Sequence, residues 1–172
     1  YEAVCYVTEK GLMNGTSAST FSPDAAMTRA MMVTILWRME KEPAALKSNF
    51  TDLTADWYRT AVDWAAETGV VNGVGNGKFA PNATLSLEQL ITILYRYAEN
   101  KGYNVSKSAS LDSFTDGSAV SAYARPAMQW AVGMNFLSGN TLTPGAPASR
   151  AQIAQVLMLL SLIHISEPTR HL

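Results

Sequence analysis

The chain has 172 residues, of which 48% are hydrophobic, and its 13 basic and 14 acidic side chains give a net charge of −1. This hydrophobic content can supply the core of one globular domain or of a tight array of small units. Nothing in this nearly neutral charge balance suggests a nucleic-acid-binding protein, for which a basic stripe would be expected. No apolar run reaches the roughly 20 residues that cross a bilayer, and a single cysteine, Cys5, excludes a disulfide within the chain.

Residues 1–42 form the first predicted unit, which begins in the middle of a helix, so we expect its start to be missing. A glycine-containing loop and Phe21-Ser-Pro23 follow that helix. A second helix is predicted to begin at Thr28, a favourable N-cap residue. Met31 stands where a capping box would have glutamate or glutamine, so that box is half lost.

Residues 48–102 form a complete second unit that opens with Phe50-Thr-Asp52. Apolar residues at three- and four-residue spacing from Trp57 predict an amphipathic helix, which Gly69 ends as a left-handed C-cap. After a glycine-rich loop and Phe79-Ala-Pro81, Ser86 is predicted to begin the second helix, with a capping box completed three residues later.

Residues 112–159 form the third unit, which opens with Phe114-Thr-Asp116. Its first helix is predicted over about residues 123–135, with Pro126 in the first turn, where no backbone hydrogen bond is lost. Ser149 then begins the second helix, again with a glutamine completing the capping box. In both complete units the aspartate of the opening triplet is interpreted as a helix cap or turn former in preference to a ligand contact.

The three units are copies of one helix–loop–helix repeat. The first and second copies are offset by 58 residues throughout, as in Pro23 and Pro81, and the third follows by 63 residues at Pro144. One such helix pair is too small to bury its apolar face, whereas three copies packed together can do so. The sequence therefore predicts an all-α fold.

The last segment, residues 160–172, differs from the rest of the chain. Its sequence from Leu160 to Arg170 resembles the translation of a sequencing adapter, so we expect it to be a non-native tail. Both histidines of the chain lie there, at His164 and His171. Without them, no Ser-His-Asp or Cys-His arrangement can be built, and no metal site or cofactor site is predicted.

Together these landmarks resemble the S-layer homology family. That family's pattern runs Phe-x-Asp, a tryptophan in the first helix, Gly-Ile/Val-x-x-Gly, Phe-x-Pro, and Thr-Arg-Ala-Glu at the second helix. The ordered set occurs nearly three times over residues 1–159. The family glutamate is replaced in every copy. The resemblance implies three repeats packed with pseudo-threefold symmetry around a central helical bundle, with grooves between neighbouring repeats.

The resemblance also implies an extracellular, non-enzymatic module of the cell wall or S-layer. Its partner would be an anionic cell-wall polysaccharide, often pyruvylated, bound in the grooves. The family's arginine contact to the ketal carboxylate falls on Arg29 and Arg150, whereas the second copy has Leu87. The neighbouring hydroxyls and two candidate aromatic platforms complete the predicted binding residues: Arg29, Arg150, Thr28, Ser149, Trp57 and Tyr123.

The physical case for the arginine does not depend on the family. An arginine in the first turn of a helix lies beside unpaired backbone N–H groups and the positive end of the helix dipole, which favour an anion. Its guanidinium can grip a carboxylate with two parallel hydrogen bonds. Two alternatives stay open: the arginines are merely solvated helix-start residues, or the repeats serve self-assembly of a surface layer without binding sugar.

Overall fold

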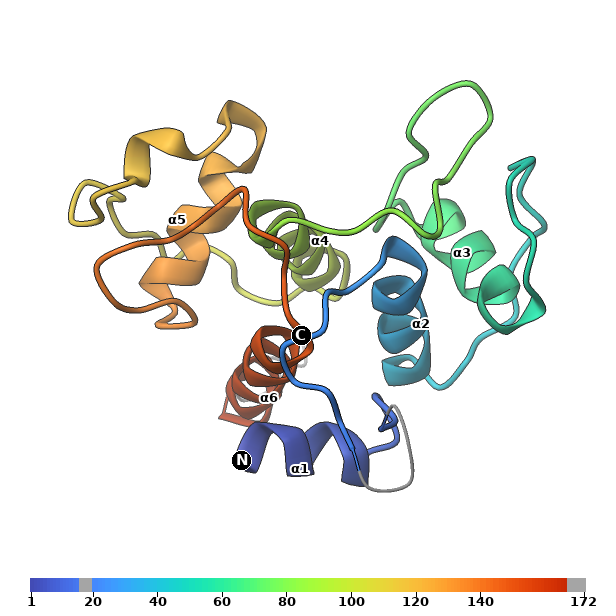
Figure 1. The fold of residues 1–172 in the computed structure, drawn as a ribbon, viewed down its shortest axis with the longest axis horizontal. Coiled ribbons are helices and arrows are strands. Elements are labelled where there is room, and N and C mark those ends of the chain that lie inside the picture. Colours follow the sequence, from blue (N-terminus) through green and yellow to red (C-terminus); the bar gives the residue numbers. More distant parts are fainter. Residues whose placement is uncertain (16–19, 167–172) are drawn as a thin grey trace, which may run out of the picture. The chain divides into compact units, whose positions relative to one another are not determined.

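The computed structural model describes residues 1–15 and 20–166, with side chains through Leu162. Over these residues the regular secondary structure is helical, with only isolated β-bridges, so the predicted all-α class is confirmed (Figure 1). The helices are α1 (Glu2–Glu9), α2 (Arg29–Met39), α3 (Asp56–Thr68), α4 (Leu87–Asn100), α5 (Arg125–Gly133) and α6 (Arg150–Ser166), with short 3-10 helices at Gly117–Ala119 and Ala122–Ala124. The remainder of the predicted tail, residues 167–172, lies outside the described residues.

The helices pack in pairs that combine successive copies of the repeat. One compact unit comprises Tyr1–Ala25 with Ser149–Leu172, and in it α1 contacts α6. The other comprises Ala26–Ala148, and in it α2 contacts α3 and α4 contacts α5. Each second helix is therefore paired with the first helix of another copy. This pairing buries the apolar faces that a single helix–loop–helix repeat could not cover alone.

The helix ends follow the capping chemistry predicted from the sequence. Thr28 accepts a hydrogen bond from the Met31 N–H, and Ser86 forms the complete capping box with Gln89. Gly69 ends α3 in the left-handed conformation, with φ of 74°. The third copy repeats the second, because Ser149 and Gln152 exchange the same two bonds.

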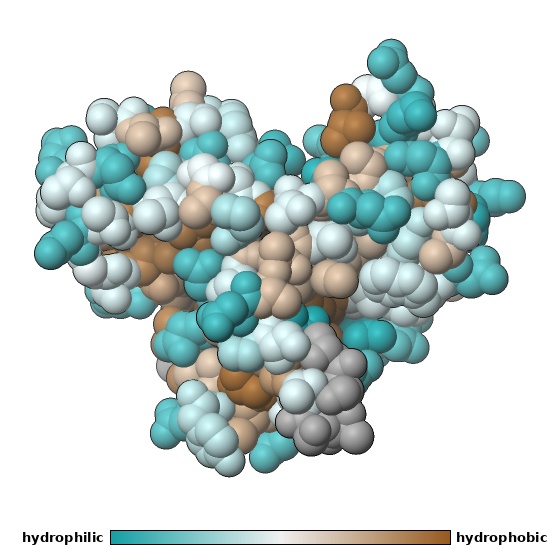
Figure 2. Space-filling view, viewed as in Figure 1, coloured by the Kyte–Doolittle hydropathy of each residue, from teal (hydrophilic) through white to brown (hydrophobic). Residues whose placement is uncertain are grey.

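The core is built from the residues at helical spacing. Trp64 and Trp130, on the first helices of the second and third copies, are 7% and 1% exposed. Helix α5 begins later than predicted, at Arg125, because Ala122–Ala124 forms a 3-10 turn; Pro126 lies in its first turn as expected. On the face in Figure 2, hydrophilic side chains predominate and hydrophobic ones form small separate groups. Within the described residues, no helix combines the length and apolar character needed to span a membrane.

A cyclic set of backbone hydrogen bonds joins equivalent residues of the three copies inside Ala26–Ala148. The Met27 N–H donates to the Ala148 carbonyl at 3.0 Å, Leu85 to Met27 at 2.9 Å, and Ala148 to Leu85 at 2.9 Å. Each of these residues directly precedes the N-cap of a second helix. The set has the cyclic order expected of three related copies. Pseudo-threefold packing of the entire chain around a central bundle stays a prediction.

Candidate ligand-binding site

Arg29, the first residue of α2, is fixed against the loop of the second copy. Its Nε donates to the Phe79 carbonyl at 2.9 Å, and its Nη2 donates to the Asn72 carbonyl at 2.7 Å. The guanidinium carbon lies 4.7 Å from the centroid of the Phe79 ring. Two directional bonds and a cation–π contact therefore hold the plane of the guanidinium in one orientation.

Arg150, the first residue of α6, makes the same three contacts in the other compact unit. Its Nε donates to the Phe21 carbonyl at 2.9 Å, its Nη2 donates to the Asn14 carbonyl, and its guanidinium carbon lies 4.6 Å from the Phe21 centroid. Arg29 and Arg150 thus share one local geometry, although they lie in different units. In the second copy the equivalent residue, Leu87, is only 2% exposed and cannot make these polar contacts.

Both guanidiniums are partly withdrawn from water. Desolvation lowers the pKa of Arg29, an effect that the nearby Asp52 carboxylate opposes, and desolvation also lowers the pKa of Arg150. Arginine nevertheless stays protonated in proteins. Two of the five N–H bonds of the Arg29 guanidinium are used on carbonyls, which leaves three without an acceptor among the described residues.

The expected unpaired N–H groups at these helix starts are not found. The Arg29 N–H donates to Ala83 and the Ala30 N–H donates to Pro81, both at 2.9 Å. The next N–H, from Met31, is taken by the Thr28 side chain. This part of the prediction is wrong, because the Phe-x-Pro proline of the next copy and the turn that follows it supply the acceptors. An anion at this point would be bound by side chains and not by backbone N–H groups.

Arg29 lines a pocket of about 360 Å³. Residues from three copies line it: Arg29 from the first, the loop and α4 of the second, and Tyr123 from the third. The full lining is Arg29, Val71, Asn72, Gly73, Gln89, Thr92, Ile93, Arg96 and Tyr123. Two arginines and no carboxylate line the pocket, so its charge favours an anion.

Tyr123, just before α5, is anchored through its neighbour Ser121. The Glu88 carboxylate, only 8% exposed, accepts the Ser121 N–H at 2.9 Å and the Ser121 hydroxyl at 2.6 Å. Desolvation, assisted by Glu88 and opposed by Arg96, raises the pKa of the Tyr123 phenol. The phenol is therefore neutral at physiological pH, and its ring is 56% exposed.

The aspartates of the opening triplets shape the loops that carry the arginine acceptors. Asp52 accepts the N–H groups of Phe79 and Ala80 at 2.9 and 2.8 Å. Ala80 has a positive φ of 56°, and Thr143 repeats this at 47°. The Asp116 carboxylate likewise accepts two consecutive N–H groups of the third copy. Both aspartates therefore form turns and do not cap a helix.

Comparison with known proteins identifies this repeated arrangement. The family model described as the S-layer homology domain matches residues 1–31, 49–91 and 113–154. The chain belongs to the S-layer homology domain family. The three matched segments correspond to the three predicted repeats.

Several relatives carry these S-layer homology repeats within much longer proteins. The chain is 33% identical over 88% of its length to an endoglucanase of Bacillus sp. (strain KSM-635), of which it covers 16%. It is 30% identical over 90% of its length to a surface-layer 125 kDa protein of Lysinibacillus sphaericus, of which it covers 13%. It is 26% identical over 59% of its length to a cellulosome-anchoring protein of Acetivibrio thermocellus, of which it covers 24%.

These relationships place the S-layer homology repeats at the bacterial surface, in the cell wall or S-layer, and support a surface-anchoring role. The repeats form a non-catalytic anchoring module, and the match to the endoglucanase involves only this part of it. Among the described residues, no three histidine, cysteine, aspartate or glutamate side chains cluster in a way that could hold a metal ion.

The structure brings together only part of the predicted site. Arg29 and Tyr123 line the same pocket, whereas Thr28 and Ser149 use their hydroxyls as helix caps. Trp57 does not line this pocket; it is 53% exposed and packs edge-on against Tyr58, with ring centroids 5.0 Å apart.

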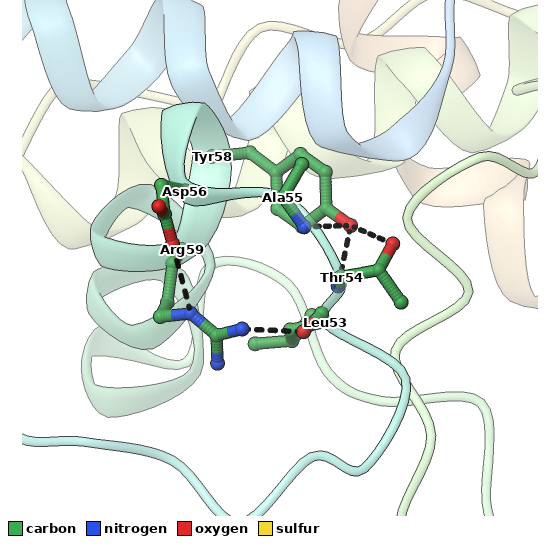
Figure 3. A network of polar contacts seen from close by, with 6 residues as sticks. All are labelled: Leu53, Thr54, Ala55, Asp56, Tyr58 and Arg59. Atoms are coloured by element: carbon green, nitrogen blue, oxygen red, sulfur yellow. Dashed lines mark hydrogen bonds and ion pairs between the residues drawn. The ribbon is translucent and has the colours of Figure 1, made fainter.

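Trp57 belongs instead to the start of α3, where a tyrosine hydroxyl organises the backbone. The Tyr58 hydroxyl accepts the N–H groups of Thr54 and Ala55 at 3.0 and 3.3 Å (Figure 3). Arg59 donates to the Leu53 carbonyl at the same helix start (Figure 3). This network fixes the entry of the chain into α3 and explains the local order around Trp57 without a ligand.

Two polar residues of the pocket, Gln89 and Arg96, were not predicted as binding residues. A signal for them exists in the sequence. Starting from the capped beginning of α4, positions 89, 92, 93 and 96 follow helical spacing, so they share one face of the helix. Whether that face of α4 is turned toward Arg29 depends on how the copies pack against one another. The spacing of residues along the helix does not reveal this packing.

Proposed function

We propose that this chain attaches a bacterial surface protein non-covalently to an anionic cell-wall polysaccharide. The acidic substituent, such as a pyruvate ketal, would be held by Arg29 in the pocket formed by the three S-layer homology repeats. The supporting observation is a guanidinium fixed by the Phe79 and Asn72 carbonyls that still presents free N–H groups to a pocket without carboxylates.

Preorganisation makes this arrangement suitable for binding. The orientation of Arg29 is set before a ligand arrives, so less side-chain freedom is lost on binding than with a mobile cation. Its partial desolvation also strengthens the attraction to a carboxylate. A hydrogen bond to a charged group contributes about 1.5–3 kcal/mol net.

The size of the pocket suggests what part of the polymer it would take. At about 360 Å³ it lies near the lower end of the roughly 300–1,000 Å³ range of small-molecule sites. A substituted sugar unit suits this volume better than a long stretch of chain. Attachment would then arise from several weak contacts along one polymer, which gain strength from each other through avidity.

Arg150 would contribute a second contact of the same kind. It has the same two carbonyl acceptors and the same ring contact as Arg29. Leu87 removes this possibility in the second copy. We therefore expect binding to depend on two arginines and to be weakened, but not abolished, when either is replaced.

Co-sedimentation with purified cell walls tests the proposal. Wild-type chain, Arg29→Ala, Arg150→Ala and the double variant would be compared, with Lys107→Ala as an exposed-cation control and circular dichroism to monitor folding. Each single variant should bind less, and the double variant least. Undiminished binding by the folded double variant would refute the mechanism. If light scattering then showed concentration-dependent association without polymer, the self-assembly alternative would be favoured.

A further inference from the structure

Arg29 and Arg150 each donate to the main-chain carbonyl of an asparagine that precedes a glycine. The Arg29 Nη2 lies 2.7 Å from the Asn72 carbonyl oxygen, and the Arg150 Nη2 donates to the carbonyl of Asn14. In the third copy the equivalent loop residue is Ser138, and its counterpart at the helix start is a leucine. At this loop position, the Asn-Gly dipeptide therefore occurs only in the two copies whose carbonyl accepts an arginine bond.

The Asn72-Gly73 dipeptide is open to attack on its own side chain. Both residues are exposed and lie outside the helices. Within the described part of the chain, neither the Asn72 carboxamide nor the Gly73 N–H forms a hydrogen bond. An asparagine that precedes a glycine loses its side-chain amide readily, because a residue without a Cβ lets its nitrogen reach the asparagine Cγ. Packing retains this glycine, since an added Cβ would lie 2.6 Å from the Phe50 ring.

We propose that Asn72 is a site of spontaneous deamidation whose product inactivates the Arg29 contact. The Gly73 nitrogen gives its proton to a solvent base and forms a bond to the Asn72 Cγ. The bond from Cγ to the side-chain nitrogen then breaks, and this nitrogen takes a proton from water and leaves as ammonia. Water opens the remaining five-membered imide at one of its two C–N bonds. Breaking the new bond to Cγ yields aspartate, and breaking the original peptide bond yields isoaspartate.

Either product places a carboxylate beside the guanidinium of Arg29. In isoaspartate the chain continues through Cγ, so the former main-chain carbonyl, whose oxygen accepts the Arg29 bond at 2.7 Å, becomes the carboxylate. In aspartate the carboxylate belongs to the side chain of a residue that lines the pocket. A carboxylate is a stronger acceptor for a guanidinium than a neutral carbonyl. The pocket, whose lining has no carboxylate before the reaction, then holds its own anion and repels that of a ligand.

This effect on binding rests on the proposed function, whereas the deamidation itself does not. Asn14 has the same relation to Arg150, so the two arginine contacts are lost independently of each other. The chain then loses its hold on an anionic polymer in two steps that depend on time, temperature and pH. Deamidation would thus release old surface proteins from the wall before newly made ones.

Mass spectrometry of the whole chain, kept in mildly alkaline buffer and digested at intervals, tests the reaction. Asn72 should convert to a mixture of aspartate and isoaspartate, which fragmentation of the peptide distinguishes. Asn82 is the internal control, because it is also exposed but precedes Ala83, whose N–H donates to the Ala80 carbonyl at 3.1 Å. Conversion of Asn72 no faster than that of Asn82 would overturn the inference.

Asn72→Asp reproduces the charge of the product and tests its effect on binding. The probe is a methyl glycoside that carries a pyruvate ketal, titrated while the Arg29 Nε–H is followed by NMR. Asn72→Asp should weaken binding at Arg29 about tenfold or more. Asn76→Asp adds the same charge to another exposed Asn-Gly dipeptide, which lies outside the pocket lining, so it should leave this binding unchanged.

Undiminished binding by folded Asn72→Asp, or an equal loss for Asn76→Asp, would overturn the proposed effect. If Asn72→Asp kept wild-type affinity while Arg29→Ala lost binding to cell walls, this inference would fail and the proposed function would stand. Undiminished wall binding by the folded double arginine variant would refute the proposed function, whereas the conversion of Asn72 would still be measured in the mass spectra.

Discussion

Replacing Arg29 with methionine separates the structural role of this side chain from its proposed role in binding. Methionine keeps an unbranched aliphatic stem but removes the donors to the Phe79 and Asn72 carbonyls and the cation over the Phe79 ring. The Phe79 carbonyl is partly buried, so it would lose a partner that water replaces only in part. We therefore expect Arg29→Met to destabilise the chain even without any ligand.

The size of the effect follows from these three contacts. Each hydrogen bond to a charged group contributes about 1.5–3 kcal/mol, and a cation–π contact contributes roughly 0.5–2 kcal/mol. Desolvation of the guanidinium offsets part of this sum, as the lowered pKa of Arg29 indicates. A net loss of about 2–4 kcal/mol is expected, which corresponds to a fall in Tm of roughly 5–15 °C for a chain of this size.

Thermal unfolding followed by circular dichroism measures this effect, with Arg96→Met as the matched control. Arg96 is exposed and has no partner among the described residues, so its replacement should change the free energy of unfolding by less than about 0.5 kcal/mol. If Arg29→Met unfolded at the same temperature as Arg96→Met, the carbonyl contacts would contribute nothing to stability. The conclusion that these contacts fix the orientation of Arg29 would then be refuted.

Two further changes test the loop that holds Arg29. Asp52→Asn should destabilise the chain by about 1–3 kcal/mol, because an amide cannot replace a carboxylate that accepts two N–H bonds. Burial acts to raise the pKa of Asp52, but the N–H groups of Phe79 and Ala80 lower it overall. The Asp52 carboxylate therefore contributes its full stabilisation above the unfolded pKa of about 3.9, and this contribution is lost as pH falls through the lower folded pKa. In denaturant titrations from pH 5 to 2, the free energy of unfolding should fall less for Asp52→Asn than for the wild type. Gly73→Ala should cost about 1–3 kcal/mol in the same assay, since an added Cβ would lie 2.6 Å from the Phe50 ring and 2.8 Å from the Lys78 carbonyl. Wild-type stability of either variant would contradict the described loop.

Local chemistry made much of the fold predictable. A short stretch of sequence is enough to recognise the serine and threonine N-caps, the Gly69 C-cap and the apolar spacing of the helices. Each of these features depends only on the backbone beside it. The same holds for the placement of Pro126 in the first turn of α5. These features need no information about which copy packs against which.

The candidate pocket was less predictable because residues of three copies line it. The family resemblance identified Arg29, and its position at the helix start supported that choice, but its carbonyl acceptors lie 43 and 50 residues away in the chain. The same long-range pairing supplies carbonyl acceptors for the backbone N–H groups that we expected to be unpaired. Trp57 and Tyr123 occupy equivalent positions in their copies, yet only Tyr123 lines this pocket. Periodicity places a residue on a helix face, whereas the partner of that face depends on tertiary packing.

We propose that the guanidinium of Arg29 captures a carboxylate on the wall polymer. Isothermal titration calorimetry with purified polysaccharide, before and after mild acid hydrolysis of its pyruvate ketals, tests this most directly. The wild type should lose about tenfold or more in affinity when the ketals are removed, and folded Arg29→Gln should show a smaller loss than the wild type, because only Arg150 would still bind the ketals in the proposed way. Equal affinity of the wild type for the intact and the stripped polymer would contradict the account.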